Sequence, residues 1–170
     1  DVYGPTAAFT NTAGTCIDYN VNLKSTSSTD GTHPITQYHW TFGDTRSATV
    51  TTPETTHTYD AAGAYTVKLI VKDSYGCIDS LVKQRAVLIT QPIAKFTESD
   101  TLSCSKNVIE FRSTSTGSSL KYKWQFGDTG TATTQRPTYT FVNSGVYTVK
   151  LVVTDRYGCV DSVVKENRIT

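Results

Sequence analysis

The strongest constraint on the fold is an internal repeat, because one pattern of residues occurs twice in the chain. "YHWTFGDT" at residues 38–45 matches "YKWQFGDT" at residues 122–129. "AGAYTVKLIVKDSYGCIDSLVK" at residues 62–83 matches "SGVYTVKLVVTDRYGCVDSVVK" at residues 144–165. The spacing between the copies drifts by a few residues, as expected when loops change length and strands do not. A repeat of this period predicts two similar domains in tandem.

The ends of the chain agree with a division into residues 1–90 and 91–170. "VYGPTAAF" at residues 2–9 aligns with "ITQPIAKF" at residues 89–96, so the chain begins where a preceding repeat would end. The sequence contains no Met, and it shows no signal peptide. We therefore expect two units cut from a longer tandem array, with a natural two-domain chain as the alternative.

Within each repeat, apolar and polar residues alternate with a period of two, which is the pattern of β-strands. Residues 65–73 place Tyr, Val, Leu and Val on one face and Thr, Lys, Ile and Lys on the other. Shorter runs at residues 7–10, 17–25 and 37–42 are also interpreted as strands, and residues typical of turns separate them. The sequence predicts an all-β fold of two tandem Ig-like, seven-stranded Greek-key β-sandwiches.

The repeated motif resembles the polycystic kidney disease (PKD) domain. Its pattern is W-x-F-G-D, a loop, and then G-x-Y-T-V-x-L-x-V-x-D. The motif residues singled out here are Trp40, Asp44 and Tyr65 in the first copy and Trp124, Asp128 and Tyr147 in the second. Two features depart from the family pattern. Thr45 and Thr129 follow the G-D pair where the family usually has Gly, and Tyr139 replaces the histidine that the first copy has as His57.

We expect these motif residues to be structural. Each tryptophan should fill the centre of its sandwich. The tyrosines, which follow a turn glycine, resemble a tyrosine corner that ties down the connection before the sixth strand. Asp44 and Asp128 should accept backbone N–H groups in the G-D turn. Calcium bound at these carboxylates, as in some PKD domains of secreted proteases, is the alternative, but no Asp-rich loop supplies the 6–8 oxygens that Ca²⁺ requires.

Catalysis finds no support in the sequence. His33, His39 and His57 all lie in the first repeat and have no histidine counterpart in the second. The chain contains no G-x-S-x-G, no H-E-x-x-H and no phosphate-binding loop. The sequence therefore predicts no catalytic residue, no cofactor and no metal ligand.

The four cysteines are Cys16, Cys77, Cys104 and Cys159. They form no C-x-x-C pair, so they indicate disulfides and an oxidising compartment rather than zinc. In a sandwich of this kind, Cys16 and Cys77 are expected at opposite poles, whereas a disulfide requires Cα atoms within about 7 Å. The leading hypothesis is therefore a Cys16–Cys159 bond across the domain junction. The alternative pairs Cys16 with Cys77 and Cys104 with Cys159 inside each repeat.

The resemblance also carries an expectation about function. The "YGC" hairpin with its earlier cysteine is similar to PKD repeats of large secreted surface proteins of Gram-negative bacteria. Many of these use the type IX secretion route, and some are adhesins or gliding-associated filaments. The resemblance implies a non-catalytic spacer of an extracellular, cell-surface adhesin, stalk or filament. The alternative is an accessory carbohydrate- or protein-binding module of a secreted hydrolase.

Charge and hydropathy limit the partners. Lys and Arg number 16 against 15 Asp and Glu, and no apolar run approaches a membrane span, so neither nucleic acid nor membrane insertion is expected. The expected partners are neighbouring repeats or identical chains joined head to tail, with a surface glycan or protein as a further candidate. Ser80, Thr101 and Ser162 lie in D-[ST]-aliphatic patterns that resemble acceptors of bacterial O-glycosylation.

Overall fold

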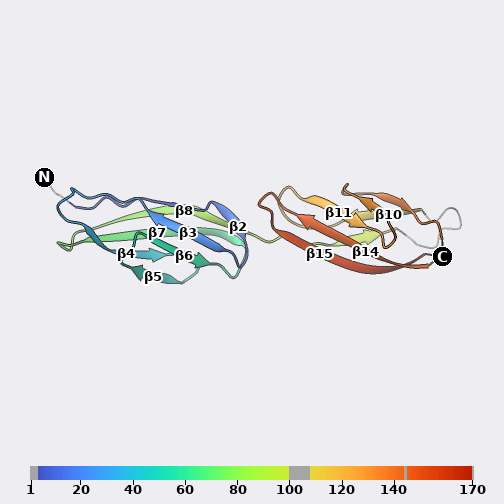
Figure 1. Cartoon of the computed structure of the whole chain (residues 1–170), viewed down its shortest axis with the longest axis horizontal. Coiled ribbons are helices and arrows are strands. Elements are labelled where there is room, and N and C mark those ends of the chain that lie inside the picture. Colours follow the sequence, from blue (N-terminus) through green and yellow to red (C-terminus); the bar gives the residue numbers. More distant parts are fainter. Residues whose placement is uncertain (1–3, 100–107, 144, 170) are drawn as a thin grey trace. The chain divides into compact units, whose positions relative to one another are not determined.

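The computed structural model describes residues 4–99, 108–143 and 145–169 and divides the chain into two compact units, 1–90 and 91–170 (Figure 1). The described residues contain strands and turns but no helix, and hence no helix long and apolar enough to cross a membrane. The predicted all-β class is confirmed.

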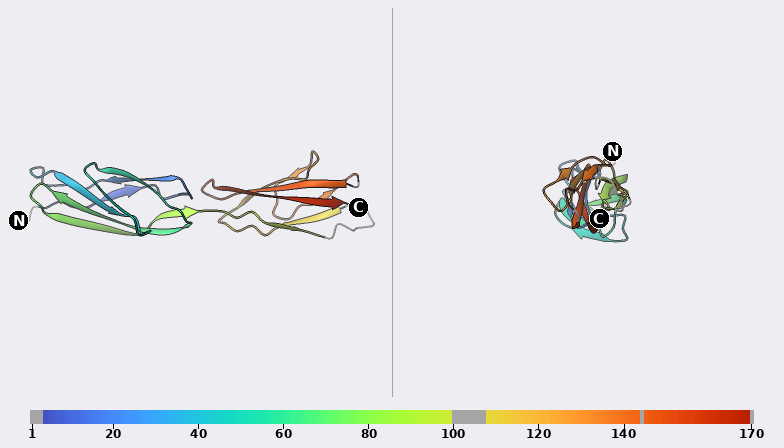
Figure 2. Two further views of the ribbon diagram at one scale, coloured as in Figure 1. Left: turned by 90° about the horizontal axis from the view of Figure 1, so that it is seen from below. Right: turned by 90° about the vertical axis from the view of Figure 1, so that its right-hand side faces the viewer.

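The first unit is a sandwich of two sheets. One sheet has the order β1-β3-β6 and the other has the order β2-β8-β7-β4-β5. Its strands are β1 (Phe9–Asn11), β2 (Gly14–Cys16), β3 (Asn20–Ser25), β4 (Ile35–Thr41), β5 (Ser47–Val50), β6 (Glu54–Thr58), β7 (Gly63–Asp73) and β8 (Ile78–Thr90). Figure 2 shows the strands of this unit from two further directions.

This unit has one strand more than the seven expected, because its first strand changes sheets. β1 pairs antiparallel with β3, and the chain then crosses so that β2 pairs parallel with the end of β8. The cross-over places Cys16 opposite Thr90, at the point where the chain leaves the unit.

The second unit repeats the design. Its sheets have the orders β13-β10-β9 and β12-β11-β14-β15. The strands are β9 (Phe96–Glu98), β10 (Val108–Ser113), β11 (Lys121–Gln125), β12 (Thr131–Ala132), β13 (Thr138–Thr140), β14 (Gly145–Thr154) and β15 (Val160–Ile169). The residues equivalent to β2 lie outside the residues that the structure describes.

Alternating side chains build both cores, as the period-two pattern predicts. In β7, Val67, Leu69 and Val71 are fully buried, as are their counterparts in β14. Trp40 and Trp124 are also fully buried at the centres of the two cores, and each packs edge-on against the phenylalanine of the first strand. Truncating such an aromatic core residue to Ala typically costs about 3–5 kcal/mol.

The final hairpins differ between the units. In the first unit, residues 84–86 of β8 stand opposite the single residue Thr66, and Arg85 has a positive φ of 52°. This is a β-bulge. In the second unit, β14 and β15 pair without interruption from Gly145–Ile169 to Thr154–Val160. The bulge lies after the matched segments and makes the last strand of the first unit longer than that of the second.

A lysine in the last strand of each unit bridges the two sheets of that unit. Lys83 of β8 donates to the carbonyl of Phe9, and its ammonium lies 4.6 Å from the centre of the Phe9 ring. Lys165 of β15 donates to the carbonyl of Phe96 at 2.7 Å and lies 4.7 Å from that ring. Each lysine therefore joins the last strand to the first strand of its unit.

Candidate functional site

The G-D turn after β4 is the most polar cluster of the first unit. Gly43 has a φ of 84°, and a Cβ added there would lie 2.5 Å from the carbonyl oxygen of Thr66, so only glycine fits. Asp44 Oδ1 accepts the backbone N–H of Arg46 at 3.2 Å. Asp44 Oδ2 makes a hydrogen bond of 2.8 Å with His57 Nε2. The turn and strand β6 are thereby joined through one carboxylate.

Arg46 completes this cluster. Its Nε donates to Asp44 Oδ2 at 2.9 Å, and its terminal nitrogen lies 3.2 Å from Asp60 Oδ2. Burial raises the pKa of the Asp44 carboxyl, but hydrogen bonds from His57 and Arg46 outweigh it, so the pKa lies below its ordinary value. Asp44 is therefore an ionised, fully engaged structural group.

The second unit keeps the carboxylate and changes its partner. Asp128 Oδ1 accepts the N–H of Gly130 at 2.7 Å, and the hydroxyl of Tyr139 donates to Asp128 Oδ2 at 2.8 Å. This hydrogen bond raises the pKa of Tyr139. The aromatic stacking is also kept, because His57 stacks on Phe42 and Tyr139 stacks on Phe126. Tyr139, which replaces the family histidine, therefore keeps both the hydrogen bond to the carboxylate and the stacking on the phenylalanine.

The motif tyrosines tie the connection before the long strand. The hydroxyl of Tyr65 donates to the carbonyl of Ala61 at 2.8 Å, and that of Tyr147 donates to Asn143 at 3.0 Å. A further tyrosine, Tyr59, donates to the carbonyl of Phe42 from a buried position, and burial raises its pKa. These bonds close backbone loops and leave no hydroxyl poised as a nucleophile.

The "DSYGC" and "DRYGC" turns are organised by their first residue. Asp73 is 3% exposed, and its Oδ1 accepts the backbone N–H groups of Tyr75 and Cys77, both at 2.9 Å. The corresponding bonds in the second unit join Asp155 Oδ1 to Tyr157 N at 2.8 Å and to Cys159 N at 3.0 Å. Sequence reasoning missed this role, although an Asp four residues before the cysteine in both copies was a visible signal.

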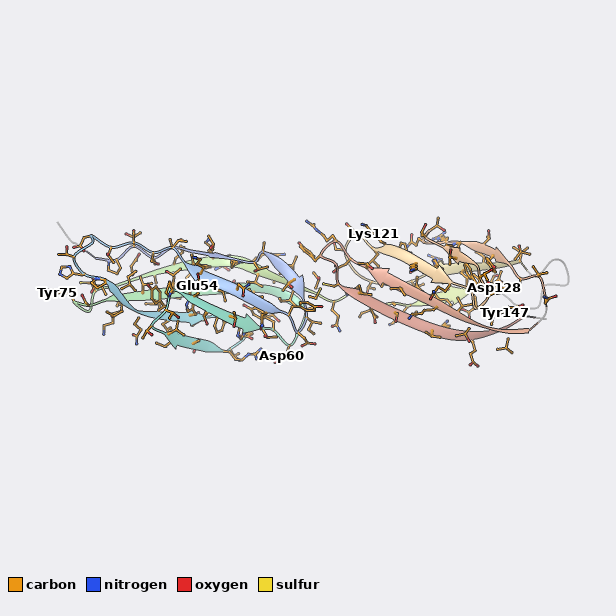
Figure 3. The ribbon with its side chains drawn as sticks, viewed as in Figure 1. Glu54, Asp60, Tyr75, Lys121, Asp128 and Tyr147 are labelled. Atoms are coloured by element: carbon orange, nitrogen blue, oxygen red, sulfur yellow. The ribbon has the colours of Figure 1, made fainter. Side chains whose placement is uncertain are left out.

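The cysteine positions correct one of the two pairing hypotheses. Cys77 is a free, exposed thiol in the turn between β7 and β8. Tyr75 of the same turn is labelled in Figure 3. Cys16 pairs with Thr90 at the other end of β8, and the intervening strand spans about 35 Å. A Cys16–Cys77 disulfide is therefore wrong for this structure. Cys104, and with it the proposed Cys104–Cys159 bond, lies outside the described residues, whereas Cys159 is described and buried.

The candidate glycosylation sites occupy equivalent surface positions. Ser80 and Ser162 are exposed on the outer faces of β8 and β15, and Thr101 lies outside the described residues. The preceding aspartates have a structural role: Asp79 accepts the N–H of Ala7 at 2.7 Å, and Asp161 accepts that of Ala94 at 2.8 Å. These hydrogen bonds account for the aspartate of the D-S pattern independently of any glycosylation at the serine.

The surface of the first unit has two shallow hollows. One, of about 380 Å³, lies beside the G-D turn, and the other, of about 660 Å³, lies over β3 and β6, where the ion-paired Lys24 and Glu54 are among its lining residues. Within the described part of the chain, no group of three His, Cys, Asp or Glu side chains could hold a metal ion. Since Arg46 and His57 already engage Asp44, the G-D turn offers a hydrogen-bonded carboxylate and not a set of calcium ligands.

Both halves of the sequence match the model of the PKD domain, over residues 3–88 and 89–170. The chain belongs to the PKD domain family. The resemblance inferred from the motif is thereby confirmed, and the polar clusters described above are the turns of two successive PKD domains.

Three relatives define the similarity. A 96-residue segment is 30% identical to collagenase ColA of Clostridium perfringens, covering 56% of this chain and 8% of that protein. A 56-residue segment is 43% identical to collagenase ColQ1 of Bacillus cereus, covering 33% of this chain and 6% of that protein. The PKD1 domain of the Vibrio cholerae metalloprotease PrtV is 26% identical, with a TM-score of 0.42, and covers 47% of this chain and 98% of its own. Tandem PKD domains similar to small parts of two collagenases support a non-catalytic accessory module.

Proposed function

We propose that these PKD domains form a spacer segment of an extracellular surface protein, stalk or filament, in which domains are linked in series. The observation that carries the proposal is the path of the chain through each domain. In the first domain the chain enters beside the hairpin tip, where Ala7 bonds to Asp79, and leaves at Thr90. These points are separated by most of β8, about 35 Å. In the second domain, Ala94 bonds to Asp161, and β15 runs away from that point to Ile169.

The terminal strands of the first domain also suit a segment under tension. β2 runs parallel to the end of β8, with Gly14–Cys16 paired to Leu88–Thr90. Pulling the two ends of the domain apart drives these strands past one another in opposite directions. Their hydrogen bonds must then break together instead of one at a time, which favours slow forced unfolding.

A disulfide between Cys16 and Cys159 would stiffen the junction in this proposal. Cys16 pairs with Thr90, immediately before the linker. Cys159 belongs to the hairpin whose Asp161 bonds Ala94, immediately after the linker. The two cysteines therefore flank the same short segment, residues 91–93. Closing such a loop contributes about 2–4 kcal/mol, although the mechanism is model-dependent.

The partners follow from the same geometry. Cys77 occupies in the first domain the position that Cys159 occupies in the second, and its thiol is exposed. In a longer array, Cys77 would bond to the cysteine of a preceding domain. In a filament of identical chains, the partner would be Cys104 of the preceding copy.

Peptide mapping of the unreduced protein tests the disulfide proposal. The expected result is a crosslinked peptide that contains Cys16 and Cys159, with Cys77 open to alkylation. A Cys16–Cys77 peptide would overturn it. Single-molecule pulling of the chain then tests the spacer role. Each domain should unfold at high force, and Cys16→Ser, unlike Cys77→Ser, should make the junction looser. Unfolding of both domains at very low force would contradict a tension-bearing role.

The similarity to two collagenases favours a second candidate. In this alternative the tandem domains are an accessory module that holds a carbohydrate or protein close to a hydrolase domain elsewhere in a secreted protein. Saturable binding of the fragment to one class of ligand on a glycan or protein array would support the module. Its absence would leave the spacer as the better assignment.

A further inference from the structure

The outer face of the larger sheet in the second domain carries a cluster of lysines. Lys121 and Lys123 lie two residues apart on β11, exposed on the face opposite the buried Trp124. Figure 3 shows Lys121. Lys150 of β14 stands opposite Gln125, which makes it a diagonal neighbour of Lys123. Diagonal pairs across antiparallel strands are about 7–8 Å apart. These three lysines are called the cationic face below.

The cationic face carries one carboxylate among the outward positions of β11, β12, β14 and β15 that the structure describes. Glu166 stands opposite Thr148 and is therefore a diagonal neighbour of Lys150. No described outward carboxylate stands opposite or diagonal to Lys121 or Lys123. The three lysines therefore outnumber the carboxylate, and an anionic ligand would relieve the remaining repulsion.

The first domain shows a weaker version of the same arrangement. Lys68 of β7 stands opposite Thr41, in the place that Lys150 holds opposite Gln125. Lys72 lies further along the same face, and His39 occupies the place of Lys123. The outward positions of β4, β5, β7 and β8 carry no carboxylate among the described residues. Cations on this sheet are thus a property of both repeats, and Glu166 is the one described acidic residue among these outward positions.

The surroundings of the lysines indicate the kind of anion. Val152 stands opposite Lys123 and Val164 stands opposite Lys150. The other outward-facing neighbours include the polar uncharged residues Gln125, Thr131, Thr148, Thr154 and Ser162, which can hydrogen-bond the hydroxyls of a sugar. The outward positions described on these strands present no aromatic ring, which a single-stranded nucleic acid would use for base stacking. The lysines are spread over two strands of a sheet surface, which suits an extended chain better than a small ion.

We propose that the outer face of β11 and β14, through Lys121, Lys123 and Lys150, binds an acidic polysaccharide. The ligand class is an extended sugar chain that carries carboxylate or sulfate groups. The lysines bind the charged groups, and the neighbouring Thr, Ser and Gln side chains bind hydroxyls. The corresponding face of the first domain is a second, weaker site. This inference rests on the second candidate function and not on the spacer role, because it names the class of carbohydrate and the face of each domain that an accessory module would use.

Binding to two probes tests the proposal, with polygalacturonate as the carboxylate polymer and heparin as the sulfated one. The test variant is Lys121→Gln/Lys123→Gln/Lys150→Gln. The matched control is Lys95→Gln/Arg112→Gln/Arg136→Gln, which removes the same charge from exposed positions on or near the other sheet of the same domain. At 50 mM salt, we expect saturable binding to at least one probe by calorimetry. The test variant should bind at least tenfold more weakly, and the control should lose less than threefold.

Several outcomes would overturn the proposal. Equal losses in both variants would mean that net charge, and not this face, attracts the polymer. Absence of saturable binding to either probe at millimolar sugar concentration would remove the site altogether. Equal or tighter binding of single-stranded DNA through the same lysines would replace the ligand class. Thermal unfolding of both variants checks that the fold is intact. The disulfide map is independent of all these measurements, so the spacer proposal and this one can fail separately.

Discussion

His57 and Tyr139 occupy equivalent positions in the two PKD domains, and each makes a 2.8 Å hydrogen bond to the carboxylate of its G-D turn. Their rings also stack on the phenylalanine that precedes the turn. Two chemically different side chains therefore perform the same local task. What differs is how the bond responds to pH, because a histidine can carry a positive charge and a tyrosine cannot.

Acid should weaken the first domain through Asp44. Its pKa is lowered in the folded state, so the ionised carboxylate stabilises the fold above its ordinary value of 3.8. That contribution is lost as the pH falls through the lower folded pKa. Urea unfolding between pH 2 and 7 should show that Asp44→Asn is less stable than the parent near neutrality and that the difference shrinks in acid. Asp60→Asn, which removes an exposed carboxylate, is the control and should change little at any pH. A pH-independent cost of Asp44→Asn would contradict this reading.

Thr45 is strained in a way that Thr129 is not. Thr45 has a φ of 74°, a conformation that glycine adopts far more easily than a β-branched residue, whereas Thr129 is not among the residues with positive φ. We expect Thr45→Gly to stabilise the first domain by about 1 kcal/mol. The same change at Thr129 should destabilise the second domain by about 0.5–1 kcal/mol, because glycine gains entropy on unfolding. Denaturant midpoints resolve the two effects, and loss of stability at both sites would show that Thr45 is not strained.

The two core tryptophans should respond differently to loss of the indole N–H. Trp124 Nε1 donates to the carbonyl of Thr134 at 2.9 Å, whereas Trp40 Nε1 is buried without a hydrogen-bond partner among the described residues. Substitution by Phe removes similar volume in both domains but breaks a hydrogen bond in the second domain alone. Trp124→Phe should therefore cost about 1 kcal/mol more than Trp40→Phe. Calorimetric unfolding of each single variant measures the difference, and equal costs would argue against it.

The hairpin turn should depend on Asp73. Its carboxylate accepts two backbone N–H groups from a nearly buried position, so Asp73→Ala leaves both donors without that partner. We expect a loss of about 2–4 kcal/mol, since hydrogen bonds to charged groups are worth about 1.5–3 kcal/mol each. Ser74→Ala, one residue further on and exposed, should be nearly neutral. Amide exchange at Tyr75 and Cys77 reports the turn directly, and unchanged protection in Asp73→Ala would refute its role.

The fold class and the family could be predicted because they depend on local patterns. Alternation in residues 65–73 identified the buried face of β7, and the Trp, Gly, Asp and Tyr motif identified the PKD domain. The cross-over of β2 was not predictable, because three residues carry no periodicity and their partner strand lies more than 70 residues away. The β8 bulge likewise depends on the pairing partner and not on the bulged residues alone.

The polar clusters were only partly predictable for a related reason. The turn role of Asp44 follows from its neighbours in sequence, but its bond to His57 requires β6 to lie against the turn. The hydrogen bonds from Lys83 to Phe9 and from Ala7 to Asp79 join residues that lie close in space but near opposite ends of the domain's sequence. Comparing the two repeats would have pointed to them, since both lysines and both aspartates recur at equivalent positions.

The lysine that bridges the sheets in each domain also bears on the tendency of these domains to aggregate. β7 and β14 are apolar, β-branched segments of the kind that assemble into fibrils when exposed, and the strands beside them end their sheets over much of their length. An inward-pointing charge next to an open strand edge discourages a foreign strand from adding there. Lys83 and Lys165 place such a charge at the same point of each domain. Each domain therefore carries its own protection against edge-to-edge association with a neighbouring strand.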